Sequence, residues 1–283
     1  YYADVCEAHI LPKFGHLRLS ELSKQQIIAY TDRLAAKRTG HAANHVIRTL
    51  SAMYGWGNAR GEVDINPARG IPKYKQTTGS GKGKRHLEQR EIALFWNDLP
   101  SVPLVGPALV SALRLLLLTG QRTSEVVGAE LSEFEFEGKM PCWTIPAHRI
   151  GSKRRTEPHA VPLTPLMAQL WKDAIAQFGN DTHVFPVQRK ANAQHITRHS
   201  MATACRRYRE HFGRNAPAPH GLRKTMSTHM ARLGILTEIR ERCQGHKQLG
   251  VQDSVYNQYQ YYDERRDAFV KWENELISLV GSK

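Results

Sequence analysis

The sequence predicts a mainly α-helical protein with one small antiparallel β-sheet, divided into two domains. Apolar residues recur at helical spacing over most of the chain, and the period changes to two only between about residues 134 and 163. Residues 73–85 are rich in Gly, Ser and Lys and lack apolar periodicity, which is typical of a linker. We therefore expect a first domain over residues 1–72 and a second over residues 86–283.

The composition favours a polyanionic partner. The 283 residues include 40 Lys and Arg against 26 Asp and Glu, a formal net charge of +14, and nucleic acid is the usual partner of so basic a chain. No apolar run approaches membrane-spanning length, so no membrane partner is expected. The four cysteines form no CxxC pair, which fits a reducing cytoplasm and argues against a thiolate metal site.

The first domain is expected to be all-helical. Its helices are predicted at about residues 3–11, 24–36 and 40–57. The third helix should bury an apolar side made of Val46, Ile47, Leu50, Met53, Tyr54 and Trp56. Its polar face is predicted to contact DNA phosphates or bases and consists of His41, Asn44, His45 and Arg48. Two histidines one turn apart also occur in zinc proteases, but no third ligand follows, so no metal site is predicted.

The linker carries positive charge, including Lys82 and Lys84. That charge would allow the linker to lie along a DNA phosphate backbone, although a linker that only connects the two domains flexibly would be just as basic.

In the second domain, short strands are predicted at residues 134–136, 143–145 and 160–163. The loop between the last two carries Lys153, Arg154 and Arg155, a natural probe for a DNA groove or backbone. Helices are predicted at about residues 88–99, 108–118, 165–178 and 193–208, and a last helix through Phe269, Trp272, Leu276 and Leu279.

Arg122 follows a helix that Gly120 should end, and Thr123 or Ser124 can cap the next helix. An arginine at a junction of packed helices is costly unless it is paired, and Glu125 is the expected partner. A simple Arg–Glu pair without a ligand is the alternative.

Residues 220–246 are predicted to form a helical hairpin that begins with His220 and Arg223 and closes with Gly245 and His246. Guanidinium matches phosphate oxygens in a fork, and imidazole moves a proton near neutral pH. These residues therefore suit the binding and protonation of a phosphate, although histidines at helix ends also serve as caps.

One reaction uses all of these groups together with a late tyrosine. The tyrosine oxygen attacks a DNA phosphate, the arginines neutralise the charge that builds on the non-bridging oxygens, and the lysine of the loop between the last two strands protonates the departing sugar oxygen. A histidine accepts the tyrosine proton, and no metal is required.

Several spaced motifs also resemble those of the tyrosine recombinases, or phage-type integrases, in the branch carried by genomic islands and satellite phages. The resemblance covers nearly the whole chain. The motifs that carry it are NPA at 66–68, TGQRTSE at 119–125, the strands WTIP and HAVPL, HGLRKT at 220–225, GH at 245–246 and YNQYQYYDERR at 256–266.

The resemblance implies a role for each matching residue. It makes Arg122 and Arg223 phosphate clamps and has Glu125 support Arg122. Lys153 would be the leaving-group acid, with Arg154 as the alternative. His220 would be an acid–base or phosphate-contacting residue, and His246 a phosphate hydrogen-bond donor. Tyr256 would be the nucleophile that forms a 3′-phosphotyrosyl link, with Tyr259, Tyr261 and Tyr262 as alternatives.

The same resemblance implies a helical core-binding domain joined to a mixed α/β catalytic domain, with no metal, ATP or other cofactor. It implies that the partners are double-stranded DNA attachment sites and DNA-bending accessory proteins. It also implies a homotetramer on DNA, with the tail after Tyr262 packed on a neighbouring subunit. The implied location is cytoplasmic, in the bacterial nucleoid or a phage-infected host. An arm-type DNA-binding domain usually precedes these two in the family. The chain opens without a methionine and already in a helix-like pattern, so it is expected to be a fragment. A type IB topoisomerase and a non-catalytic DNA-binding regulator derived from an integrase are the competing hypotheses.

Overall fold

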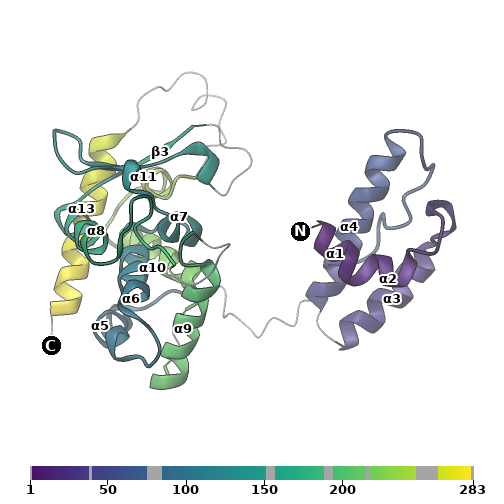
Figure 1. Ribbon diagram of the computed structural model, residues 1–283, viewed down its shortest axis with the longest axis horizontal. Helices are drawn as coiled ribbons and strands as arrows, with labels where there is room; N and C mark the ends of the chain where they lie inside the picture. Colours follow the sequence, from purple (N-terminus) through teal and green to yellow (C-terminus); the bar gives the residue numbers. More distant parts are fainter. Residues whose placement is uncertain are drawn as a thin grey trace. The chain divides into compact units, whose positions relative to one another are not determined.

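The computed structural model describes residues 2–37, 40–74, 85–150, 157–187, 194–214, 217–246 and 261–281. The chain divides into two compact units, Tyr1–Ser80 and Gly81–Lys283, whose helices and strands are shown in Figure 1. None of the described helices combines the length and apolar character needed to cross a membrane.

All regular elements in the described part of the first unit are helices, and residues 59–74 follow them as turns and extended chain. Its elements are α1 (Tyr2–Val5), the π-helical turn η1 (Cys6–Ile10), α2 (Leu11–Phe14), η2 (Leu19–Glu21), α3 (Lys24–Lys37) and α4 (Gly40–Asn58). The first three follow one another directly, so the helix predicted over residues 3–11 continues to Phe14. Helices α3 and α4 pack against each other, with Ile27, Val46 and Leu50 fully buried between them and their neighbours.

Two predictions about α4 were wrong. Trp56 is 59% exposed, because it lies two residues, or about 200° of helix rotation, from the buried Tyr54. Asn44 is buried rather than on the exposed polar face. Its Nδ2 donates to the Tyr74 carbonyl and its Oδ1 accepts from the Tyr74 N–H, both at 2.9 Å. Asn44 therefore fixes the backbone of residue 74 in this unit.

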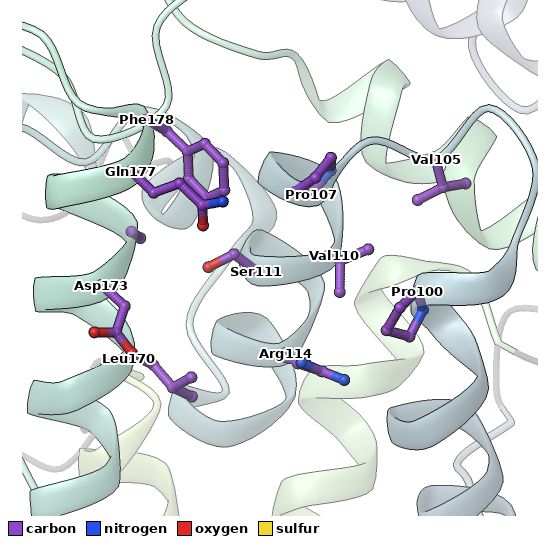
Figure 2. Close-up of a pocket in the computed structure, with 11 residues that line it drawn as sticks. Pro100, Val105, Pro107, Val110, Ser111, Arg114, Leu170, Asp173, Gln177 and Phe178 are labelled. Carbon is purple, nitrogen blue, oxygen red and sulfur yellow. The ribbon is translucent and has the colours of Figure 1, made fainter.

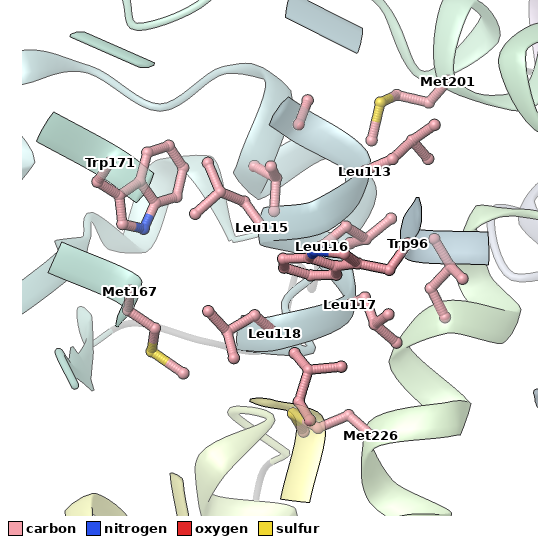
Figure 3. Packing of buried hydrophobic residues seen from close by; sticks show 14 of the residues in the cluster. Trp96, Leu113, Leu115, Leu116, Leu117, Leu118, Met167, Trp171, Met201 and Met226 are labelled. Carbon is pink, nitrogen blue, oxygen red and sulfur yellow. The ribbon is translucent and has the colours of Figure 1, made fainter. Parts of the chain in front are cut away.

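The second unit surrounds the apolar helix α6 (Pro107–Thr119). A helix that is apolar on all sides is stable only when other elements cover it. Leu115, Leu116, Leu117 and Leu118 are fully buried, and Figure 3 shows them among side chains of neighbouring helices such as Trp171 and Met226. The elements before and after α6 are α5 (Gln89–Asp98), η3 (Leu99–Ser101), α7 (Thr123–Val127), η4 (Leu131–Glu133), β1 (Phe134–Glu135), β2 (Cys142–Ile145), η5 (Ala147–Arg149), β3 (His159–Pro162), α8 (Pro165–Phe178), α9 (Arg198–Phe212), α10 (Pro219–Arg232), α11 (Thr237–Cys243) and α13 (Tyr262–Gly281).

The three strands form one antiparallel sheet in the order β1-β2-β3. Trp143 of β2 pairs with Phe134 of β1 and Val161 of β3, and both Trp143 and Val161 are fully buried. Alternate strand residues point to one face, which explains the period of two in this region. The segment 151–156, which joins η5 to β3, lies outside the described residues.

Two further predictions about this unit need correction. Helix α9 begins at Arg198, not near residue 193, because the Thr197 hydroxyl caps it by accepting the Ser200 N–H at 3.1 Å. The tail after Tyr262 was expected on a neighbouring subunit, but α13 packs on α5, α11 and α10 of its own chain. Figure 1 shows this helix, in yellow, within the second unit, where it fully buries Phe269 and Trp272.

Candidate active site

Seven of the predicted site residues of the second unit lie in its described part, namely Arg122, Glu125, His220, Arg223, His246 and the alternative nucleophiles Tyr261 and Tyr262. The predicted residues outside the described part are Lys82, Lys84, Lys153, Arg154, Arg155, Tyr256 and Tyr259.

Arg122 lies in the turn between α6 and α7. Gly120 ends α6 in the left-handed conformation, with φ 61°, and Arg122 itself is the residue that precedes α7. The predicted caps Thr123 and Ser124 are therefore inside the helix. Glu125 caps it instead: its buried carboxylate accepts the Arg122 backbone N–H at 2.7 Å and Nη1 at 2.8 Å. The side chain of Arg122 is thus oriented by a fixed negative charge.

Arg223 lies in the first half of α10 and is only 4% exposed. Its Nη1 donates to the Gly120 carbonyl at 2.8 Å, and its Nη2 donates to the Gln244 carbonyl at 2.6 Å. Carbonyls at helix C-termini lack partners within the helix and carry partial negative charge, so they suit a buried guanidinium. Arg223 therefore joins the turn that holds Arg122 to the end of α11.

His246 follows α11 in a Schellman motif. Gly245 adopts the left-handed conformation with φ 62°, the Gly245 N–H donates to the Arg242 carbonyl, and the His246 N–H donates to the Glu241 carbonyl at 2.9 Å. Arg223 Nη2 lies 2.9 Å from His246 Nε2. Because guanidinium only donates, Nε2 is the acceptor and the ring hydrogen is on Nδ1. Gly245 is thus required for the turn that brings His246 to Arg223.

His220 lies in the first turn of α10, with part of its surface open to solvent. Desolvation of its ring lowers the pKa of His220, and nearby positive charges lower it further. Those charges belong to Arg223, Lys224 and Arg122. The imidazole is consequently neutral near pH 7, the form that can accept a proton.

Arg122, His220, Arg223 and His246 thus form one group, here named the cationic cluster. Arg223 contacts both the Gly120 turn and His246, and the positive charges of both arginines lower the pKa of His220. Two oriented guanidinium groups beside two imidazoles can hold an anion such as a phosphate and transfer a proton at it.

Two of the tyrosines weighed as nucleophiles are described. The Tyr262 hydroxyl donates to the Pro141 carbonyl at 2.9 Å, and burial raises the pKa of Tyr262. Both effects oppose ionisation of the Tyr262 hydroxyl and attack by its oxygen. Tyr261 has a positive φ of 53°, and the Arg242 guanidinium carbon lies 4.1 Å from the centre of its ring.

The sequence did not single out two buried glutamines next to the cluster. Gln244 donates from Nε2 to the Arg223 carbonyl at 3.0 Å, and Gln121 donates to the carbonyls of Thr119 and Cys243. No sequence signal distinguishes a buried glutamine from one on the surface. Adjacency of Gln121 to Arg122 was the available hint.

In the first unit, the rings of His41 and His45 lie 4.0 Å apart and Arg48 is exposed. Desolvation, then the charges of His41 and Arg48, lowers the pKa of His45. Within the described ranges no three His, Cys, Asp or Glu side chains gather as a metal site.

A cavity of about 360 Å³ lies on the α8 side of α6, and Figure 2 shows its lining. Its polar lining includes Arg114, Asp173 and Ser111, and it shares no residue with the cationic cluster. Arg114 donates to the Trp96 carbonyl at 2.9 Å.

Residues 106–262, more than half of the chain, match the model of the phage integrase family. The chain belongs to the phage integrase family. This match confirms the predicted family, and the helices with one three-stranded antiparallel sheet confirm the predicted fold class. Over 291 aligned residues the chain is 22% identical to the integrase of Enterobacteria phage P4, covering 98% of this chain and 64% of that protein. It therefore spans less than two thirds of this relative's length.

Solved structures with a similar fold share little sequence with the chain. A lambda integrase fragment, solved as a dimer bound to a COC′ core site, has a TM-score of 0.66 at 17% identity and covers 87% of this chain and 86% of its own. The Tn1549 transposon integrase in complex with circular intermediate DNA has a TM-score of 0.62 at 16% identity, and the match covers 94% of this chain and 89% of that one. XerH recombinase bound to its difH substrate has a TM-score of 0.60 at 15% identity, and the match covers 88% of this chain and 70% of that one.

Proposed function

We propose that this integrase cleaves and rejoins duplex DNA at specific sites through a 3′-phosphotyrosyl intermediate. The observation that carries the proposal is the convergence of Arg122, His220, Arg223 and His246 in one cationic cluster. Membership of the phage integrase family supports the same reaction.

In the proposed reaction Arg122 and Arg223 hold the scissile phosphate and stabilise the charge that develops on its non-bridging oxygens. His220, kept neutral by its surroundings, accepts the proton of the attacking tyrosine hydroxyl or contacts the phosphate. His246 donates a hydrogen bond to the phosphate. The nucleophile is Tyr256, whose oxygen forms the bond to phosphorus while the bond to the 5′ oxygen breaks.

The leaving oxygen receives its proton from Lys153 in the η5–β3 segment, with Arg154 as the alternative donor. Guanidinium and ammonium groups supply the positive charge that a metal supplies in other phosphoryl-transfer sites, so the proposed reaction uses neither metal nor ATP. A covalent intermediate conserves the energy of the phosphodiester bond for rejoining.

We assign DNA binding to both units. Residues 1–72 act as the core-binding domain through His41, His45 and Arg48; Asn44 is excluded because its amide binds Tyr74. The linker lysines Lys82 and Lys84 follow the phosphate backbone, and Arg154 and Arg155 reach a groove. Assembly as a tetramer on paired sites is supported by a related structure, the lambda integrase tetramer bound to a Holliday junction. DNA-bending accessory proteins would assist that assembly.

The test is covalent trapping. A duplex selected by binding from a random-sequence pool is nicked beside each candidate phosphate, so that the cleaved fragment diffuses away and the adduct accumulates. Wild-type protein should form an adduct that maps to Tyr256, and Tyr256→Phe should bind the duplex normally and form none.

An adduct that persists in Tyr256→Phe would refute the nucleophile assignment. Relaxation of supercoiled plasmids that lack the selected site would indicate type IB topoisomerase activity. Tight binding with no adduct at any phosphate would indicate a non-catalytic regulator. Weak salt dependence of binding would contradict all DNA-based functions.

A further inference from the structure

The carbonyl of Cys243 is a meeting point of three segments of the second unit. Cys243 is the last residue of α11 and is fully buried. The final carbonyls of a helix have no partner inside it and need donors from elsewhere. Here the donors come from the α6–α7 turn and from β3.

Gln121 supplies the first donor. Its side chain is fully buried directly before Arg122, and Nε2 donates to the Cys243 carbonyl at 2.9 Å and the Thr119 carbonyl at 2.8 Å. Because both neighbours are acceptors, the amide orientation is determined: nitrogen must face them. Gln121 Oε1 is buried and has no hydrogen-bond partner in the described part of the chain.

An unsatisfied buried amide oxygen is destabilising, since the group loses its water without gaining a donor. A residue retained for stability alone would not need that oxygen, and an apolar side chain of similar volume would fill the space. The bonds that Gln121 makes instead tie the turn of Arg122 to the end of α11, three residues before His246.

His159 supplies the second donor. It is 4% exposed at the start of β3, and its Nε2 lies 3.3 Å from the Cys243 carbonyl. Strand β3 directly follows the segment that carries Lys153. One backbone carbonyl therefore connects the segments that hold Arg122 and His246 with strand β3.

We propose that Gln121 is a positioning residue that, through the Cys243 carbonyl, holds the Gly245–His246 turn in register with Arg122 and Arg223. This inference rests on the proposed function of the cationic cluster. Gln121 contacts no DNA in this account and acts only through the backbone of α11, so its removal should affect cleavage and leave binding unchanged.

The experiment compares Gln121→Met, which conserves volume and removes the amide, with wild-type protein on the nicked duplex. We expect a fall of about tenfold in the first-order rate of adduct formation, about 1.4 kcal/mol, because displacement of reacting groups is costly. DNA affinity should stay within about twofold, and the thermal midpoint within about 5 °C, since loss of two bonds is partly offset by loss of the unpaired oxygen.

The decisive readout is coupling to His246. If Gln121 acts by positioning His246, then Gln121→Met should have almost no further effect in a His246→Ala background. Independent effects, in which the double variant loses the product of the two single losses, would overturn the proposal. An unchanged adduct rate in Gln121→Met would also overturn it.

Arg114→Met is the matched control, because Arg114 lies on the same helix as Thr119 and also donates to a backbone carbonyl, at Trp96, but away from the cluster. It should leave the adduct rate unchanged and uncoupled from His246. If Gln121→Met does not fold, Gln121→Asn, which retains a shorter amide, carries the same coupling test. Failure of the proposed function is distinguishable, because wild-type protein would then form no adduct.

Discussion

The ion pair between Glu125 and Arg122 gives a direct test of the site geometry. Glu125→Gln keeps the shape of the side chain and removes its charge. The carboxylate accepts two hydrogen bonds from Arg122, at 2.7 Å and 2.8 Å, and its side chain is 2% exposed, against 29% for Arg122. An amide presents one oxygen and one NH₂ group, so one of the two Arg122 donors would then face another donor.

The expected loss of folding stability is roughly 1–3 kcal/mol. Hydrogen bonds to charged groups contribute about 1.5–3 kcal/mol, and partial exposure of Arg122 lowers that contribution by solvent screening. Loss of one preorganised donor at a developing oxyanion costs about 10²–10³ in rate. Since Glu125→Gln loosens Arg122 without removing it, we expect cleavage to slow about 10-fold to 100-fold.

Urea denaturation and the rate of adduct formation on the nicked duplex measure the two effects. Glu137→Gln is the control, because the Glu137 side chain is 88% exposed and pairs with Lys172 at 3.1 Å, a geometry worth less than about 1 kcal/mol. Glu125→Gln with a wild-type cleavage rate and reduced stability would refute the reasoning, since the pair would then be structural only.

Two more predictions concern His220 and the α6–α7 turn. Lys224→Gln removes one of the charges that lower the pKa of His220, so that pKa should rise. In a profile of cleavage rate against pH, the low-pH side, where His220 becomes protonated, should then move to higher pH. A low-pH side that stays in place or moves to lower pH contradicts this. Gly120→Ala should cost roughly 2–4 kcal/mol in urea denaturation, because φ is +61° and the added Cβ would lie 2.3 Å from Met226 Sδ. Gly213 has a similar φ of +60°, but nothing lies within 4 Å of an added Cβ, so Gly213→Ala should cost only about 1–2 kcal/mol. Equal losses of unfolding free energy in the two variants would show that the contact with Met226 is harmless.

Much of the fold was predictable because periodicity reports which side of an element is covered. Helix α8 has the predicted bounds, Pro165–Phe178, and all three strands lie where the period changes to two. One error arose where a partner distant in sequence decides the outcome. Asn44 reads as a polar surface residue, and only the fold brings Tyr74 to its amide.

The candidate site was predictable only as a set of side chains. Spaced motifs identified Arg122, Arg223 and His246, whose types alone suggest phosphate chemistry. The groups that orient Arg223 are backbone carbonyls at helix ends, and a carbonyl has no residue-specific signature. For the same reason the role of the Cys243 carbonyl became apparent only from the structure.

In the proposed reaction the cationic cluster neutralises charge on a scissile phosphate. The most direct measurement compares wild-type and Arg122→Ala protein on two nicked duplexes, one with a normal scissile phosphate and one with an uncharged methylphosphonate there. On phosphate the variant should be slower by about 10²–10³, the cost of losing one preorganised donor. On methylphosphonate that penalty should shrink at least tenfold, because the charge that Arg122 offsets is absent. An equal penalty on both substrates would contradict the account.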